Sequence, residues 1–241
     1  MMEHYELSDI GKQREQNQDA YAVSENGRYP VYVLCDGMGG HRAGEVASKE
    51  AASDIVNTME DLMAEDDGSL FVKISSAMSH ANNHVYAMSV KEPIYGGMGT
   101  TCDVCAISPA GAHIGHVGDS RVYIFTERGL YQVTKDHSLV EEMIDQGRLT
   151  REEALTYEQK SYITRALGTQ PSVQVDTYLV AFRPGDIIMM CSDGLTNMVA
   201  EIDIAYILSG KTGLEEKARR LVDLANDNGG QDNITVILIK R

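Results

Sequence analysis

Short apolar runs rich in valine and isoleucine recur along this chain, and their length and β-branched content are typical of strands. Six such runs stand out: Val31–Cys35, Thr100–Ile107, Ala112–Val117, Arg121–Phe125, Ile187–Cys191 and Ile234–Ile239. The third and fourth runs are separated only by Gly118, Asp119 and Ser120. A parallel connection needs a crossover of about a dozen residues, so this pair of strands must be antiparallel.

Other segments have apolar residues at spacings of three and four, the period of one helix face. This pattern predicts helices over Ala43–Met63, Leu70–Val85, Glu201–Leu208 and Leu214–Ala225. These helices come in consecutive pairs rather than between successive strands. The order predicts an α+β fold in which helix pairs pack on the faces of sheets. With 241 residues, 43% of them hydrophobic, the chain is long enough for one large domain, residues 1–241.

The chain is strongly acidic, with 36 Asp and Glu against 21 Lys and Arg and a net charge of -15. Nucleic acid and anionic membranes are bound by clustered basic residues, which this sequence lacks. No apolar run approaches the roughly 18 residues of a membrane span, and the chain opens without a basic and apolar leader. We therefore expect a cytoplasmic protein that binds neither nucleic acid nor membrane. The surplus acid serves solubility or, at some positions, metal binding.

Two weaker signals do not predict a function. Cys102 and Cys105 lie in a predicted strand, where a spacing of three points their side chains to opposite faces, so no metal or redox pair is expected. His80 and His84 share a helix face but lack the Glu of an H-E-x-x-H motif, so we expect an exposed or capping role.

Four of the apolar runs carry an aspartate at one end, close to glycine: Asp36, Asp119, Asp193 and Asp232. Taken singly, an Asp-Gly or Gly-Asp pair is usually a turn. Strands of one sheet bring their ends to a common edge, so four carboxylates there would repel one another unless a cation neutralised them. Oxygen ligands without a His or Cys cluster select Mg²⁺ or Mn²⁺ rather than zinc. The pattern indicates a two-metal site that would activate a water toward phosphorus.

Two further segments bear on this hypothesis. Arg14 lies in a polar stretch before Asp19, and its guanidinium is suited to a bidentate grip on phosphate, although the spacing fits a surface position equally well. Residues 135–161 are strongly polar and helix-prone, which predicts a surface insertion that acts as a lid.

Eight motifs follow one another along the chain: "REQNQDAY", "VLCDGMGGHRAGEVAS", "GGMGTTCDVCAI", "GHVGDSRVY", "KDHSLVEEMIDQG", "TRALG", "PGDIIMMCSDGLTNMV" and "GGQDNITVILI". In this order they resemble the motif set of the bacterial metal-dependent protein Ser/Thr phosphatases of type 2C. The resemblance covers essentially the whole chain, from about Tyr5 to Lys240.

This resemblance implies a central β-sandwich of two antiparallel sheets flanked by helix pairs, a four-layer αββα arrangement with a metal cleft at one edge. It implies that Asp36 bridges two Mg²⁺ or Mn²⁺ ions and that the Gly37 carbonyl binds one of them. Asp193 and Asp232 match the ligands of the other ion. Asp119, together with Asp193, matches the ligands of a third, weaker metal.

The resemblance also implies catalytic roles. Arg14 would hold the phosphate, Asp19 would orient metal-bound water, and residues 135–161 would form a mobile flap that affects substrate choice. Eukaryotic members carry a His directly after the Asp-Gly pair as the proposed general acid, whereas Met38 stands here. His41, or a metal-bound water, would then protonate the leaving alkoxide.

The implied reaction is attack of a metal-bridging hydroxide on phosphoserine or phosphothreonine, without a phosphoenzyme. The implied partners are phosphoprotein substrates and a cognate bacterial Ser/Thr kinase, and we expect a monomer. Two alternatives are a catalytically weak phosphoprotein-binding regulatory module and a metal-dependent hydrolase of small phosphoesters or phosphodiesters, such as a nuclease. The four aspartates and Arg14 argue against the first alternative, and the acidic surface argues against nucleic acid as a substrate.

Overall fold

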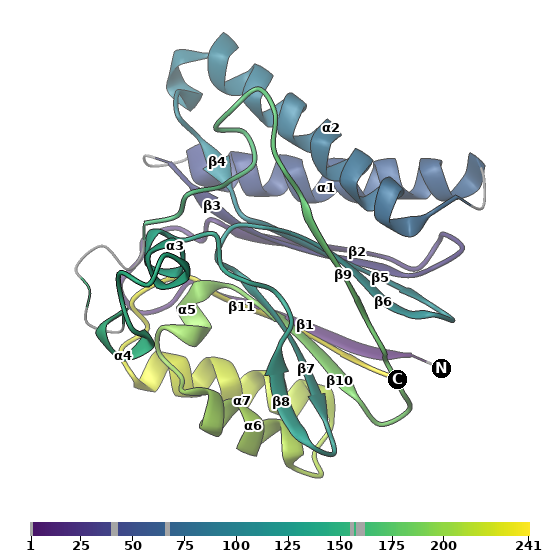
Figure 1. The fold of residues 1–241 in the computed structure, drawn as a ribbon, viewed down its shortest axis with the longest axis vertical. Helices are drawn as coiled ribbons and strands as arrows, with labels where there is room; N and C mark the ends of the chain where they lie inside the picture. Colours follow the sequence, from purple (N-terminus) through teal and green to yellow (C-terminus); the bar gives the residue numbers. More distant parts are fainter. Residues whose placement is uncertain (1, 40–42, 66–67, 155–156, 158–161) are drawn as a thin grey trace.

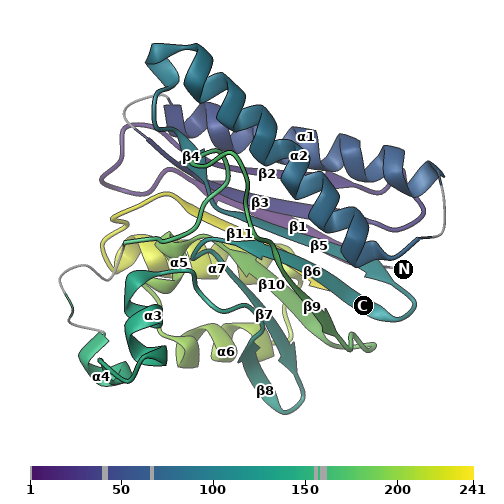
Figure 2. The ribbon, with the colours of Figure 1, turned by 45° about the horizontal axis from the view of Figure 1, so that its top comes forward.

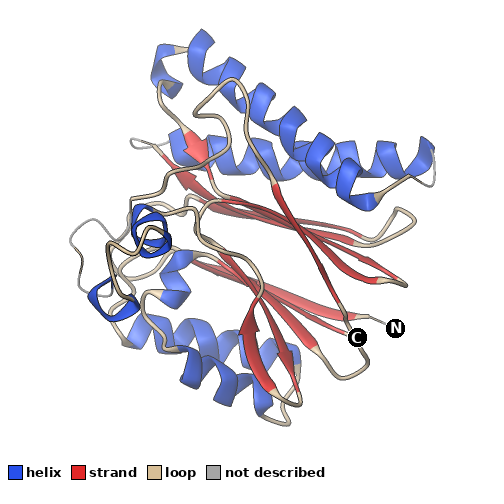
Figure 3. Ribbon diagram, in the orientation of Figure 1, coloured by secondary structure: helices blue, strands red, loops and turns tan. Residues whose placement is uncertain are grey.

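Two antiparallel sheets stacked face to face form the centre of the molecule, and a pair of helices covers the outer face of each sheet (Figures 1 and 3). The structure is a computed structural model that describes residues 2–39, 43–65, 68–154, 157 and 162–241. The predicted α+β sandwich with four layers is therefore confirmed.

The first sheet has five strands, which lie in an order unlike their order in the chain. From one edge to the other they are β1 (Glu3–Asp9), β11 (Ile234–Lys240), β10 (Ile187–Cys191), β7 (Arg121–Thr126) and β8 (Gly129–Gln132). Every neighbouring pair is antiparallel. The strand pair β1 and β11 joins two segments that are more than 200 residues apart in the sequence.

The second sheet faces the first and is also antiparallel throughout. Its strands are β2 (Asp19–Ser24), β3 (Val31–Met38), β5 (Cys102–Ser108), β6 (Gly111–Val117) and β9 (Asp176–Val180), with the short β4 (Gly99–Thr100) paired to the end of β3. The single strand predicted over residues 100–107 is wrong in detail, because Thr101 lies between β4 and β5 and turns its hydroxyl toward the Asp36 backbone.

The helices cover the two sheets in pairs. The second sheet carries α1 (Ala43–Glu65) and α2 (Leu70–Lys91), and the first carries α6 (Glu201–Ser209) and α7 (Leu214–Asp227). The short helices are η1 (Pro93–Tyr95), α3 (Leu139–Asp145), α4 (Arg151–Ala154) and α5 (Asp193–Thr196). Figures 1 and 2 both place α3, α4 and α5 at one end of the sandwich. Among the helices described, none combines the length and apolar character that crossing a bilayer requires.

Apolar side chains fill three layers, because the central strands are covered on both faces. Along β3, Val31 and Val33 pack toward α1 and α2, whereas Tyr32 and Leu34 pack between the two sheets. Complete burial of one such aliphatic side chain contributes about 1.5–3 kcal/mol. Successive residues of a strand point to opposite faces, and both faces of these strands are covered. The strands are therefore continuously apolar, and apolar and polar residues do not alternate along the sequence.

The cysteines and the paired histidines behave as the sequence indicates. Cys102 packs under the α1–α2 layer and Cys105 packs between the sheets, so their side chains point to opposite faces. All four thiols are free and buried. His80 and His84 are exposed on α2, and both rings lie near the same carboxylate oxygen of Asp54, at 3.1 and 3.3 Å.

Candidate active site

Five aspartates from different elements meet at the end of the sandwich where α5 begins. Asp36 lies near the end of β3, directly opposite Asp19, the first residue of β2. Asp193 opens α5 after β10, Asp232 precedes β11, and Asp119 lies in the tight connection between β6 and β7. Four of the five line one cleft with Arg14, Gly37 and Met38. The four strand-end aspartates predicted from the sequence do converge.

Burial and mutual repulsion shift the pKa values of these carboxyls upward. Burial, reinforced by Asp19 and Asp193, raises the pKa of Asp36 well above its ordinary value. Burial also raises the pKa of Asp19 to about 7, and that of Asp119 to about 7 with a further contribution from Asp193. For Asp193 burial and then Asp232 raise the pKa to about 6. The cluster therefore carries its full charge at neutral pH only when a cation compensates it.

The donor atoms present fit a hard divalent cation. The Oδ1 atoms of Asp19 and Asp193 are buried and have no hydrogen-bond partner among the described residues. All the candidate ligands are oxygens, the donors that Mg²⁺ and Mn²⁺ prefer. In the described ranges, no three His, Cys, Asp or Glu side chains are arranged as a finished metal-binding set.

Close backbone approaches at the cleft require two glycines. A Cβ on Gly37 would lie 2.1 Å from the carbonyl oxygen of Gly44, and one on Gly194 would lie 2.0 Å from that of Asn233. Side chains at these positions would therefore push apart α1 from β3, and α5 from β11. The glycines beside Asp36 and Asp193 hold the carboxylates in place by permitting these contacts.

Residues next to the aspartates tie the two sheets together at this edge. The Ser192 hydroxyl donates to Asp19 Oδ2 at 2.8 Å, and the Thr235 N–H donates to the same hydroxyl at 2.9 Å. The side-chain amide of Asn233 donates to two backbone carbonyls of the segment after β1, at 2.9 and 3.0 Å, and its oxygen accepts the Gln18 N–H. Ser192 and Asn233 were not predicted from the sequence, where their only signal is adjacency to Asp193 and Asp232.

Thr101 links Asp36 to the β6–β7 connection. The Asp36 N–H donates to the Thr101 hydroxyl at 2.9 Å, and the Thr101 N–H donates back to the Asp36 carbonyl at 2.8 Å. The same hydroxyl lies 2.8 Å from that of Ser120, the residue after Asp119. One buried threonine thus contacts both the backbone of Asp36 and the residue that follows Asp119.

Arg14 faces the cleft as the sequence suggested. Its Nη2 lies 2.6 Å from Asp232 Oδ2, and 52% of its side chain remains exposed. The exposed part of the guanidinium is available to an anion entering from solvent. His41 lies outside the described residues, whereas Met38 lines the cleft.

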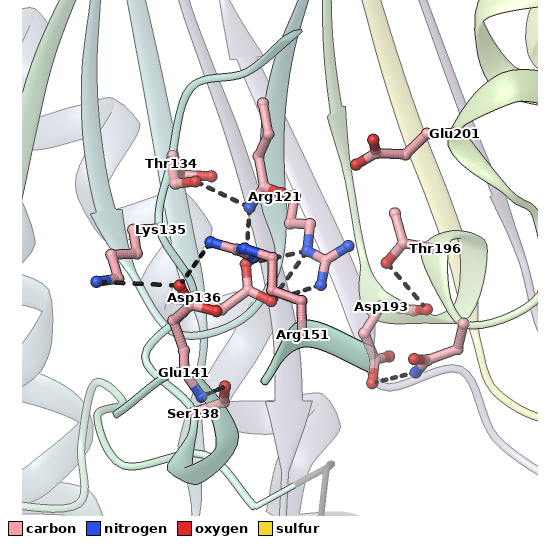
Figure 4. Close-up of polar contacts among 12 residues, drawn as sticks. Arg121, Thr134, Lys135, Asp136, Ser138, Glu141, Arg151, Asp193, Thr196 and Glu201 are labelled. Atoms are coloured by element: carbon pink, nitrogen blue, oxygen red, sulfur yellow. Dashed lines mark hydrogen bonds and ion pairs between the residues drawn. The ribbon is translucent and has the colours of Figure 1, made fainter. Parts of the chain in front are cut away.

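A second pocket adjoins the aspartates on the side of residues 135–161. Asp119, Asp193 and Thr196 line it on one side and α3 and α4 on the other. Figure 4 shows its charged groups: Arg121 grips Asp136 with Nε and Nη2, at 3.0 and 2.6 Å, and Arg151 lies 3.4 Å from Glu141. The described part of the predicted flap therefore borders the cleft; residues 155, 156 and 158–161 lie outside the described residues.

This four-layer sandwich, with acidic residues gathered at one edge, superposes on a solved Ser-Thr phosphatase of the metal-dependent PPM class. The sequence profile described as protein phosphatase 2C matches residues 11–238, and the chain belongs to this family. It is 39% identical over 240 residues to the serine/threonine phosphatase stp of Listeria monocytogenes, covering 97% of this chain and 94% of that protein. It is 38% identical over 235 residues to protein phosphatase PhpP of Streptococcus pneumoniae, covering 97% and 95%.

Solved structures of phosphatases superpose on nearly the whole chain. The Mycobacterium tuberculosis serine/threonine phosphatase PstP/Ppp matches with a TM-score of 0.89 at 35% identity, covering 99% of this chain and 98% of that chain. The catalytic domain of the serine/threonine protein phosphatase PstP in complex with two manganese ions matches with a TM-score of 0.84 at 34% identity, covering 99% and 97%.

Proposed function

We propose that this chain is a metal-dependent protein phosphatase that hydrolyses phosphoserine and phosphothreonine. The observation that carries the proposal is the convergence of Asp36, Asp119, Asp193 and Asp232 beside Arg14 at one edge of the sandwich. Family membership and the names of the relatives support the same activity. Two core Mg²⁺ or Mn²⁺ ions, and a third weaker one, are the proposed cofactors.

In this proposal the aspartates hold the ions. Asp36 would bridge two of them, with the Gly37 carbonyl on one and Asp193 and Asp232 on the other, and Asp119 would join Asp193 at the third. When bound, the ions supply the positive charge and Lewis acidity that hydrolysis of a phosphate monoester needs. The raised pKa values mean that metal binding releases protons from these carboxyls.

Arg14 has two successive partners in this proposal. Without an ion at Asp232, its guanidinium pairs with that carboxylate at 2.6 Å. An ion at Asp232 would replace this counter-charge and free the guanidinium to grip two oxygens of the substrate phosphate.

Asp19 is placed to hold or move a proton. Its Oδ2 accepts from Ser192, which leaves Oδ1 to orient the attacking water. In the ion-free protein, burial raises the pKa of Asp19 to about 7. The proton required by the leaving Ser or Thr oxygen would come from water or from His41, because Met38 cannot donate one.

We further propose that residues 1–241 act as a single catalytic domain, with residues 135–161 as its flap. The setting we propose is a monomer in the bacterial cytoplasm that opposes a Ser/Thr kinase. The net charge of -15 disfavours nucleic acid and anionic membranes as partners.

The deciding experiment compares hydrolysis of a phosphothreonine peptide with that of p-nitrophenyl phosphate, in Mn²⁺ and in excess chelator. We expect turnover of both substrates with Mn²⁺ and none with chelator. Asp193→Ala should fall to the background rate, whereas Asp223→Ala, which alters an exposed carboxylate on α7, should keep wild-type turnover.

Other outcomes would support the alternatives. Turnover in chelator, or full activity of Asp193→Ala, would refute the metal mechanism. Hydrolysis of the diester bis-p-nitrophenyl phosphate, assayed in parallel, without hydrolysis of either monoester would indicate a phosphodiesterase. Binding of the phosphopeptide without turnover would indicate a regulatory module.

A further inference from the structure

Two buried histidines lie close to Gly118, in the β6–β7 connection that carries Asp119. His116 belongs to β6, and His137 lies at the start of the flap segment, just before α3. Their ring centroids are 4.6 Å apart and the ring planes are inclined by 35°. Neither ring has a role in the reaction proposed above.

The hydrogen bonds of His137 define its tautomer. The Gly118 N–H donates to His137 Nδ1 at 3.0 Å, so Nδ1 carries no proton. The proton is therefore on Nε2, which donates to Asp176 Oδ2 at 3.1 Å. Burial, together with the neighbouring His116, lowers the pKa of His137 to about 4, so its ring is neutral at pH 7. The backbone contact runs the other way, because the His137 N–H donates to the Gly118 carbonyl at 2.7 Å.

His116 is held by two hydrogen bonds. Its Nδ1 lies 2.7 Å from Asp103 Oδ1, and its Nε2 lies 3.0 Å from the Lys135 carbonyl. A carbonyl oxygen can only accept, so Nε2 carries a proton and donates to it, while a second proton bridges Nδ1 and Asp103. Burial lowers the pKa of His116, but Asp103, Asp136 and the Lys135 carbonyl together raise it above its ordinary value. His116 and Asp103 thus hold the start of the flap segment through the Lys135 carbonyl.

Gly118 connects the two histidines to the cleft, because it donates a hydrogen bond to His137, accepts one from it, and directly precedes Asp119. Its φ is +119°, and a Cβ there would lie 2.5 Å from Thr101 Cβ. A backbone conformation of this kind is sparsely populated and persists only when the surrounding residues hold it. His137 grips Gly118 on one side of Asp119, and Thr101 contacts Ser120 on the other side.

We propose that His137 is a positioning residue for Asp119: its unprotonated Nδ1 fixes the Gly118 backbone, and through it the start of the flap is connected to the third metal position. His116, which Asp103 holds, orients His137 through contact between the two tilted rings and through its hydrogen bond to the Lys135 carbonyl. The inference rests on the proposed function only in taking Asp119 as a metal ligand.

Two conservative variants separate the two hydrogen bonds of the ring. Asparagine places its amide oxygen close to the Nδ1 position, so His137→Asn keeps an acceptor for the Gly118 N–H. Glutamine places its amide nitrogen close to the Nε2 position, so His137→Gln keeps a donor to Asp176 and loses the acceptor. His113→Gln is the control, since His113 lies on β6 with His116 but pairs with Ser108 near the opposite end of the strand.

The first readout is independent of activity and metal. In the metal-free protein, NMR should show Gly118 amide exchange accelerated by about 10-fold or more in His137→Gln, and close to wild type in His137→Asn and His113→Gln. Calorimetry should show the affinity of the weakest Mn²⁺ site lowered by about 10-fold or more in His137→Gln alone. The Mn²⁺ concentration for half-maximal activity should rise in parallel, with little change in turnover at saturating Mn²⁺.

Several results would overturn this assignment. Equal exchange and equal Mn²⁺ affinity in the two His137 variants would mean that the Nδ1 acceptor positions nothing. If neither variant folds, the ¹⁵N shifts of the wild-type ring still decide, and a protonated Nδ1 at pH 7 would exclude the proposed contact. An inactive wild-type protein would refute the proposed function but leave the exchange and calorimetry comparisons intact.

Discussion

Replacing Asp19 by asparagine should stabilise the protein when no divalent ion is present. Asp19 is 6% exposed, and its pKa rises from 3.8 to about 7 on folding, mainly through burial. Because the folded pKa exceeds the unfolded one, the stability that the protonated acid contributes is complete below about pH 4. It is lost as the pH rises through about 7. The amide of the Asp19→Asn variant would imitate the protonated acid at every pH and could still accept from Ser192.

The magnitude follows from the size of the shift. One pKa unit corresponds to about 1.4 kcal/mol, so a rise of about three units destabilises the folded wild type by about 4 kcal/mol at pH 8 and about 2 kcal/mol at pH 5. We therefore expect Asp19→Asn to exceed the wild type in free energy of unfolding by about these amounts. His137 contributes to the free energy of unfolding with the opposite pH dependence, because its pKa is lowered to about 4 and its contribution is lost as the pH falls. This contribution is the same in wild type and Asp19→Asn, so it cancels when the two proteins are compared at one pH.

The assay is urea unfolding in excess chelator at pH 5 and pH 8, with Asp223→Asn as the control on an exposed carboxylate. Saturating Mn²⁺ should reduce the difference in free energy of unfolding between Asp19→Asn and the wild type, because ion binding to the folded wild type adds stability by linkage. A variant less stable than the wild type at pH 8, or a difference that is the same at both pH values, would refute the electrostatic reasoning.

Further predictions concern binding and packing at the cleft. Asp36→Asn should abolish Mn²⁺ binding by calorimetry and turnover together, and residual tight binding would contradict its bridging role. Arg14→Ala should lower kcat/KM for a phosphopeptide by about 100-fold, with Arg14→Lys in between, and equal rates for Lys and Arg would exclude a bidentate grip. Gly37→Ala should cost at least about 2 kcal/mol in urea unfolding, because its Cβ would lie 2.1 Å from Gly44 O. Mn²⁺ affinity should fall from pH 7.5 to 5.5, since ions compete with protons for Asp193, whose pKa is about 6; pH-independent affinity would contradict this.

The strands that the sequence predicted are the central ones of each sheet, and the strands it missed are the edges. The missed edge strands are β1, β2, β8 and β9. A central strand is covered on both faces and flanked on both sides, so it is continuously apolar and easily recognised. An edge strand such as β9 alternates exposed and half-buried residues, and Leu179 is 53% exposed, so its composition differs little from that of a loop.

The candidate ligands could be predicted because each aspartate ends or begins a recognisable strand. The residues that hold them could not, since hydrogen bonds across long sequence separations leave no local pattern. Ser192 and Asp19 are 173 positions apart, and Gly118 reaches His137 only because the flap segment returns over β6. Motif order identified the family, but the tautomer of the buried His137 required coordinates.

The position of β11 between β1 and β10 has a consequence for biosynthesis. During translation β1 and β10 emerge first, and the strand that belongs between them follows more than 40 residues after β10. Until then both neighbours expose unpaired backbone, which invites association with other chains. Arg14 also waits for Asp232, 218 residues away, before its ion pair can form. The nascent phosphatase therefore has no complete cleft, and its β1 and β10 edges stay unpaired, until β11 leaves the ribosome.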